Sequence, residues 1–330
     1  MYIEQGYKGN YESWRYIVGV LIIFIGWQII GALPLMAILI MKSLGGGETV
    51  PMDVAGMSKL LGSNLFLFLM LFSFAFGLLA TFITTRYLHK QTLVSLTTSR
   101  GKIDWKRIFF AFGLWAVVTV VIMGIDLYMS PEDYEFNFEL RPFIILCIIS
   151  VLLIPLQTSF EEYFMRGYLM QGIGIMAGKR WIPLVITSLI FGILHLFNPE
   201  VEKLGYGIMV YYIGTGFFLG ILTLMDEGLE LAIGFHAANN LMTALLVTAD
   251  WTAFQTHSLY RDISEPQLGW DVFVPVLVIY PILLFVFSKK YGWTDWKERL
   301  AGDVQKNGPL VINGQSEDNA QLVDDRDADL

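Results

Sequence analysis

The chain has 330 residues, of which 55% are hydrophobic, 15% aromatic and only 16% charged, and its mean hydropathy is +0.56. Soluble domains are less apolar and about a quarter charged, so much of this chain is expected to face lipid. A net charge of −8 without a basic stripe excludes a nucleic-acid partner, and the single cysteine, Cys147, excludes disulfides within the chain and cysteine-based metal sites.

Eight apolar runs approach the length of about 20 residues that a helix needs to cross a bilayer. In chain order they cover residues 16–41, 63–85, 108–125, 142–160, 182–197, 207–224, 231–249 and 271–288. The stretch 160–178 carries three charged residues but is otherwise apolar, so we interpret it as a continuation of the fourth helix beyond a kink at Pro155. The sequence therefore predicts an all-α polytopic membrane protein with about eight transmembrane helices over residues 16–288.

The distribution of positive charge predicts the orientation of these helices. Fifteen Lys and Arg residues lie on the side that holds both termini, and five lie on the other side. Because cytoplasmic loops carry the excess of Lys and Arg, both termini are predicted to be cytoplasmic. Residues 1–15 are expected to form a cytoplasmic N-terminal segment, and residues 289–330 an acidic, disordered cytoplasmic tail. We expect a multi-pass protein of the cell membrane, specifically a bacterial inner membrane.

Ionisable side chains inside a membrane span are costly, so each one is a functional candidate. The predicted spans hold Glu161, Glu162 and Arg166 on one helix, His195 on the next, and His236 with Asn239 and Asn240 near the end of the motif region. The other two histidines, His89 and His257, lie in predicted loops and are expected to be solvated.

Helical spacing divides the first cluster into a pair and a free carboxylate. Glu162 and Arg166 are four residues apart and share a helix face, so Arg166 can neutralise Glu162. Glu161 lies about 100° around the helix and is left to face another group.

The remaining polar residues can reach the same depth in the membrane. Glu161 lies 17 residues before Gly178, and His195 lies 17 residues after it, on either side of a predicted turn at 178–180. His236 and Asn240 are four residues apart and share one face of a later helix. We therefore expect Glu161, His195, His236 and Asn240 to line one cavity, in the middle or the cytoplasmic half of the bilayer, that opens toward the cytoplasm.

This set of side chains suits hydrolysis. A buried carboxylate and an imidazole can together activate water, and His236 and Asn240 can donate to the oxyanion that forms. His195, His236 and Glu161 can equally act as three ligands of a catalytic Zn²⁺, with Glu162 as the base. The sequence contains neither a His-Glu-x-x-His motif nor a Gly-x-Ser-x-Gly elbow, which argues against zincin and serine mechanisms.

The three motifs, in this order, resemble the signature of a known family. Glu161-Glu162-x-x-x-Arg166, Phe191-x-x-x-His195 and His236-x-x-x-Asn240 look like the motifs of the CPBP intramembrane proteases. That family takes in the Ras-converting CAAX prenyl endopeptidases and the bacterial Abi proteins, which are linked to bacteriocin processing and self-immunity. The resemblance covers about residues 142–249 of the chain.

The resemblance implies an endopeptidase that cleaves a membrane-associated or lipidated peptide or protein. Glu161 and His195 would activate water, His236 and Asn240 would support the tetrahedral intermediate or a metal, and Glu162, Arg166 and Phe191 would have structural roles. Both a zinc-dependent and a metal-free glutamate mechanism have been argued for the family. A non-catalytic immunity or binding protein of the same fold is the main alternative. A proton-coupled transporter is a third, disfavoured because no inverted repeat matches the polar half of the chain.

Overall fold

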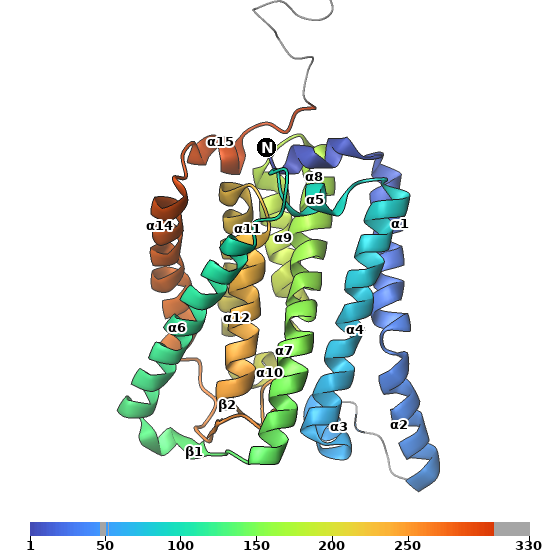
Figure 1. Cartoon of the computed structure of the whole chain (residues 1–330). Coiled ribbons are helices and arrows are strands. Elements are labelled where there is room, and N and C mark those ends of the chain that lie inside the picture. The colour runs from blue at the N-terminus through green and yellow to red at the C-terminus, as the bar shows by residue number, and fades with distance from the viewer. Residues whose placement is uncertain (47–50, 52, 307–330) are drawn as a thin grey trace, which may run out of the picture.

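A computed structural model describes residues 1–46, 51 and 53–306, which form a bundle of long helices standing side by side (Figure 1). The N-terminal part contains η1 (Ile3–Lys8), α1 (Ser13–Phe24), η2 (Ile25–Ile30), α2 (Leu33–Gly46), α3 (Val54–Leu61), α4 (Ser63–Ile83), η3 (Thr84–Leu88), α5 (Leu93–Thr97) and α6 (Trp105–Met129). The middle part contains η4 (Pro131–Asp133), β1 (Tyr134–Phe136), α7 (Leu140–Glu162), η5 (Tyr163–Leu169), α8 (Met170–Ala177), α9 (Trp181–Leu194), α10 (Pro199–Leu204), η6 (Tyr206–Ile208), α11 (Met209–Asp226) and α12 (Glu230–Leu246). The last part contains β2 (Val247–Thr248), β3 (Tyr260–Asp262), α13 (Trp270–Val274), η7 (Pro275–Ile279), α14 (Tyr280–Tyr291) and α15 (Trp296–Ala301).

The described residues contain six helices that are long and apolar enough to cross a membrane. They run over Ser13–Gly45, Ser63–Leu88, Trp105–Met129, Leu140–Ala177, Tyr206–Asp226 and Trp270–Tyr291. The other two predicted spans are α9, with 14 residues, and α12, with 17. Large apolar side chains such as Ile17, Val121 and Leu152 are exposed on the outside of the bundle, where lipid would cover them. The chain is therefore an all-α, multi-pass membrane protein, as predicted.

The fourth predicted helix continues through the charged residues, as expected. Together α7, η5 and α8 form one rod of 38 residues, about 57 Å long at 1.5 Å per residue. This exceeds the hydrocarbon thickness of about 30 Å, so the rod projects beyond the bilayer core. Its middle section, η5, is a π-helical stretch, a local widening that often occurs at functional sites.

Helix α12 lies at the centre of the bundle, because every residue from Glu230 to Ala238 is buried. A glycine lets α6 come close to it. A Cβ atom on Gly234 would lie 2.1 Å from the carbonyl oxygen of Ile108, so no larger residue fits between the two helices as they stand.

The hairpin of α8 and α9 has the predicted turn. Gly178 ends α8 in the left-handed conformation, with φ of 69°, and α9 begins three residues later. Helix α9 then packs closely on α11, because a Cβ atom on Gly216 would lie 2.7 Å from the carbonyl oxygen of Ser188. These contacts place the polar residues of α7, η5, α9 and α12 inside one bundle.

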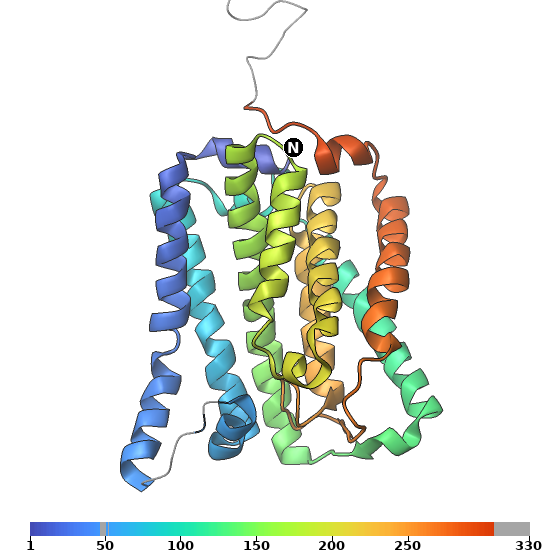
Figure 2. The ribbon, with the colours of Figure 1, turned by 180° about the vertical axis from the view of Figure 1, so that it is seen from behind.

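The two ends of the bundle differ in structure. The N-terminus, the α8–α9 turn and α15 lie at one end, and α10 and the small strands lie at the other (Figures 1 and 2). In the sheet, β3 is central: it pairs antiparallel with β1, with Tyr134 opposite Asp262, and parallel with β2, with Val247 opposite Tyr260. The sheet joins the α6–α7 connection to the segment after α12.

Two predictions are wrong, one about the C-terminal segment and one about His89. Residues 289–306 are not a disordered tail, because α14 runs to Tyr291, α15 is helical, and Asp303 forms an ion pair with Lys179. The rest of the predicted tail, 307–330, lies outside the described residues. His89 is not solvated either: it is buried, and its Nε2 lies 2.8 Å from the hydroxyl of Tyr168. His257 is half-buried.

Candidate active site

The predicted pair of Glu162 and Arg166 is present and fully buried. Arg166 Nη1 donates a hydrogen bond of 3.0 Å to Glu162 Oε1, and Nη2 donates one of 3.1 Å to the carbonyl oxygen of Gly216. The guanidinium carbon also lies 4.4 Å from the ring centroid of Phe191. The pair and its contacts thus connect η5 to α9 and α11.

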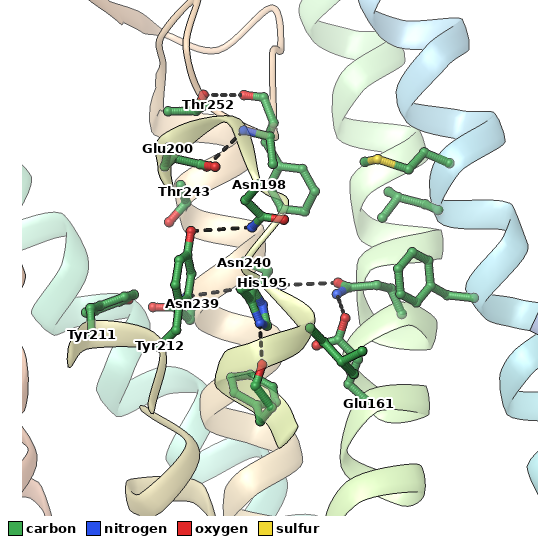
Figure 3. Close-up of a pocket in the computed structure, with 18 of the residues that line it drawn as sticks. Glu161, His195, Asn198, Glu200, Tyr211, Tyr212, Asn239, Asn240, Thr243 and Thr252 are labelled. Carbon is green, nitrogen blue, oxygen red and sulfur yellow. Dashed lines mark hydrogen bonds between the residues drawn. The ribbon is translucent and has the colours of Figure 1, made fainter. Parts of the chain in front are cut away.

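Glu161 points away from this pair and lines a cavity (Figure 3). Its Oε1 accepts a hydrogen bond of 2.5 Å from Gln157 Nε2, one helical turn earlier. Its Oε2 has no hydrogen-bond partner among the described residues. The side chain is 17% exposed. One carboxylate oxygen is therefore held in place, and the other is buried without a hydrogen-bond partner, in a side chain that lines the cavity.

His236 lies behind the two carboxylates. Its Nδ1 lies 2.8 Å from Glu162 Oε1, and its Nε2 lies 3.4 Å from Glu161 Oε2. Because Glu162 is an acceptor, the Nδ1 proton of a neutral His236 is directed at Glu162, and Nε2 is left as an acceptor facing Glu161. His236 is buried and is not among the residues that line the cavity, contrary to the expectation that it would be.

His195 lines the cavity from the C-terminal end of α9. It follows the last helical residue rather than lying within the helix, as the predicted span implied. Its Nδ1 lies 2.7 Å from the carbonyl oxygen of Phe191, and its ring stacks on that of Tyr212, with the ring centroids 4.5 Å apart. The carbonyl fixes the proton on Nδ1, so Nε2 is free to accept a hydrogen bond.

Asn240 lines the cavity as predicted, but its amide also belongs to a chain of hydrogen bonds. Its Nδ2 donates to Gln157 Oε1 over 3.1 Å, and its Oδ1 accepts from Asn239 Nδ2 over 3.1 Å. Asn239 Oδ1 in turn accepts a hydrogen bond of 3.1 Å from Trp115 Nε1. The chain runs from Trp115 on α6 to Glu161 on α7 and orients the carboxylate.

Gln157 is a polar residue of the site that the sequence analysis missed. It is a polar side chain in an apolar run, four residues before Glu161 and so on the same face of α7. That spacing is the signal that could have identified it. Trp115 and Tyr212 carry no such signal, because aromatic residues are frequent in every span.

The cavity has a volume of about 400 Å³. An apolar wall lies on η2 and α4 and includes Trp27, Met70 and Phe74. Helix α10 and the segment after α12, which carries Trp251 and Thr252, line the end of the cavity that we call its rim. Both rim elements lie at the end of the bundle opposite the termini (Figure 1).

The other end of the bundle is closed. Tyr2 and Ile3 of the N-terminal segment are buried there, and the Tyr2 hydroxyl donates to the carbonyl oxygen of Leu96 over 2.6 Å and to that of Arg166 over 3.2 Å. The prediction that the cavity opens on the side of the termini is therefore wrong. Its physical reason is that the sequence gives the depth of each residue along its helix but not which loops pack over it.

The predicted zinc ligands do not fit a metal ion as they are placed. Within the described residues, no three His, Cys, Asp or Glu side chains come together in an arrangement that could hold one. His236 is turned toward Glu161 and Glu162, while His195 lies on the wall formed by α9.

Comparisons with known proteins agree with the motifs. Residues 140–242 match the model of the Rce1-like family, described as type II CAAX prenyl endopeptidase Rce1-like. The uncharacterized protein YyaK of Bacillus subtilis (strain 168) is 27% identical over 273 residues, which cover 82% of this chain and 90% of YyaK. No solved structure matches the chain. The matched segment holds all seven residues of the three motifs, so residues 140–242 are similar to the Rce1-like family in the part of the chain that carries the candidate site.

Proposed function

We propose that the chain is an intramembrane endopeptidase that hydrolyses a peptide bond of a membrane-associated peptide or protein. The observation that carries the proposal is the state of the Glu161 carboxylate. One oxygen is held by Gln157, the other has no hydrogen-bond partner among the described residues, and the side chain lines the cavity. A general base needs this combination of a fixed orientation and a free lone pair.

In the first step Glu161 Oε2 takes a proton from a water molecule in the cavity. The water oxygen bonds to the scissile carbonyl carbon, and the carbonyl oxygen becomes an oxyanion. His195 Nε2 accepts the second hydrogen of the water and so orients it. The Asn240 amide has two N–H groups, of which Gln157 engages one, so the other can donate to the oxyanion.

In the second step the C–N bond breaks and the proton on Glu161 passes to the leaving nitrogen. The products are a carboxylic acid and an amine, and Glu161 returns to its ionised form. Between the steps, His236 Nε2 can accept a hydrogen bond from the protonated carboxyl 3.4 Å away. We assign His236 this positioning role, because the structure does not bring it to the cavity surface as an oxyanion donor.

The experiment that tests the proposal compares peptide termini across the membrane proteome of cells carrying the wild-type chain or Glu161→Gln at equal abundance. We expect termini that appear only with the wild type, and these would also identify the substrate class, whether lipidated C-terminal peptides, bacteriocin leaders or membrane-anchored regulators. Identical termini in both strains would instead support a non-catalytic immunity or binding protein.

We further propose that the protein lies in the cell membrane of a bacterium with both termini in the cytoplasm. The excess of Lys and Arg on the side of the termini supports this orientation, which would place the rim of the cavity on the outer face of the membrane.

A labelling experiment tests the orientation. In a Cys147→Ser background, Glu132→Cys in η4 should react with a membrane-impermeant maleimide on intact cells. Lys102→Cys, which is exposed at the other end, should react only after permeabilisation. The reverse pattern would invert the orientation.

We expect catalysis to survive removal of metal ions, because no group of three His, Cys, Asp or Glu side chains in the described part of the chain is placed so that it could hold a metal ion. The purified protein should contain well below one zinc per chain and keep its cleavage rate within about twofold after treatment with a chelator. Loss of activity that added Zn²⁺ restores, and that other divalent ions do not, would contradict the prediction.

A further inference from the structure

A second carboxylate in the cavity is not used by the proposed reaction. Glu200, on the short helix α10, lines the same cavity as Glu161 and lies near its rim (Figure 3). His195 and Asn198 lie between the two carboxylates in this view. A peptide that reaches Glu161 from the rim therefore passes Glu200.

Only one of the two carboxylate oxygens of Glu200 has a hydrogen-bond partner. Its Oε1 accepts a hydrogen bond of 2.9 Å from the backbone N–H of Ala253. Its Oε2 is buried and has no hydrogen-bond partner, and no Lys or Arg side chain forms an ion pair with it among the described residues. Burial raises the pKa of the Glu200 carboxyl, because charge is disfavoured away from water, and the bond from Ala253 opposes this shift.

A neighbouring aromatic side chain has a hydrogen-bond donor that lacks an acceptor. Trp251 also lines the cavity, and its indole Nε1 is a buried donor without an acceptor in the described residues. Buried polar groups without partners are uncommon in folded proteins and call for an explanation. Here two side chains that line one cavity each keep a polar atom without a partner, an acceptor on Glu200 and a donor on Trp251. A residue with a cationic side chain and a backbone carbonyl would complement both.

The charge of the cavity favours a cation over an anion. Its described lining includes the carboxylates of Glu161, Glu200 and Asp262 and no Lys or Arg. Aromatic rings such as those of Trp251 and Tyr212 add the faces on which ammonium and guanidinium groups bind.

We propose that Glu200 binds a Lys or Arg side chain of the substrate peptide as the peptide enters from the end of the bundle opposite the termini. This assignment rests on the proposed function in taking the ligand to be a peptide. Glu200 would then determine specificity without taking part in the chemical step. The ion pair would restore the lost solvation of its carboxylate, and the Trp251 indole would donate to a peptide carbonyl.

The test measures binding, so that it does not depend on cleavage. Glu161→Gln protein in detergent is mixed with an equimolar library of dodecapeptides randomised over Lys, Arg, Gln, Leu, Ala and Glu. Retained peptides are isolated by gel filtration and read by mass spectrometry. We expect Lys and Arg to be enriched over Gln by at least about tenfold at one position, as a charged hydrogen bond in a desolvated site predicts.

Three further substitutions show whether Glu200 causes the enrichment. Adding Glu200→Gln should remove the enrichment, and adding Glu200→Lys should replace it with enrichment of Glu. Glu202→Gln, on the exposed side of the same short helix, should leave the preference unchanged. Thermal unfolding of each variant shows that the fold is retained.

Several outcomes would overturn the inference. They are retention of peptides without a basic preference, a preference that survives Glu200→Gln, and retention of no peptide by any variant. The proposed function is tested separately, by cleavage with wild-type Glu161. Cleavage without a basic preference would reject the role of Glu200 alone, whereas retention that depends on Glu200, without cleavage, would reject the protease alone.

Discussion

Glu161→Gln is expected to lower the rate of peptide cleavage by at least about a thousandfold, within the range that a positioned general base contributes. The substitution keeps the volume of the side chain, and Gln157 can still hydrogen-bond its oxygen, but the amide cannot take a proton from water. The measurement is kcat/KM of the purified variant and the wild type on a substrate identified from the proteome comparison.

The control for this variant lies on the same helix. Glu139 is exposed at the start of α7, so Glu139→Gln should cleave at the wild-type rate. Thermal midpoints of both variants should match that of the wild type. A Glu161→Gln protein that keeps more than about a tenth of the wild-type rate would show that another group is the base.

Arg166→Ala is expected to destabilise the fold by about 3–5 kcal/mol, the cost of removing one partner of a buried ion pair. It leaves the fully buried Glu162 without its counter-charge and the carbonyl of Gly216 without its donor. The measurement is the yield of monodisperse protein in detergent and its midpoint of thermal unfolding.

A second variant separates lost charge from lost packing. The double variant Arg166→Met with Glu162→Gln removes both charges while keeping most of the volume, so it should unfold at a higher temperature than Arg166→Ala. Arg141→Ala, at the exposed start of the same rod, should behave as the wild type. If Arg166→Ala folds and cleaves normally, the pair does not hold the site together.

Local spacing was enough to predict much of this site. The pairing of Glu162 with Arg166 follows from the rise of one helix, and the approach of Glu161 and His195 follows from two equal segments on either side of Gly178. Both depend only on regular helices and a tight turn. The family match covers residues 140–242 and so includes these positions.

Other features depend on how helices are rotated about their axes, which spacing does not give. His236 and Asn240 share a face, yet His236 is turned to the two carboxylates and only Asn240 reaches the cavity. The burial of His89 depends on its contact with Tyr168, 79 residues away in sequence. The side on which the cavity opens depends on loops with no periodic pattern.

The contacts of α6 have a consequence for protein engineering. The segment that matches the family begins at residue 140, yet two contacts join it to α6. Trp115 donates a hydrogen bond to Asn239, and the backbone carbonyl of Ile108 lies close against Gly234. Residues on both sides of the family boundary therefore have to change together. A chimera that exchanges residues 1–139 for those of a relative would need a matched donor to Asn239 and an equally close approach at Gly234. Residues 140–242 are therefore not expected to keep their structure when they are moved to another protein without α6.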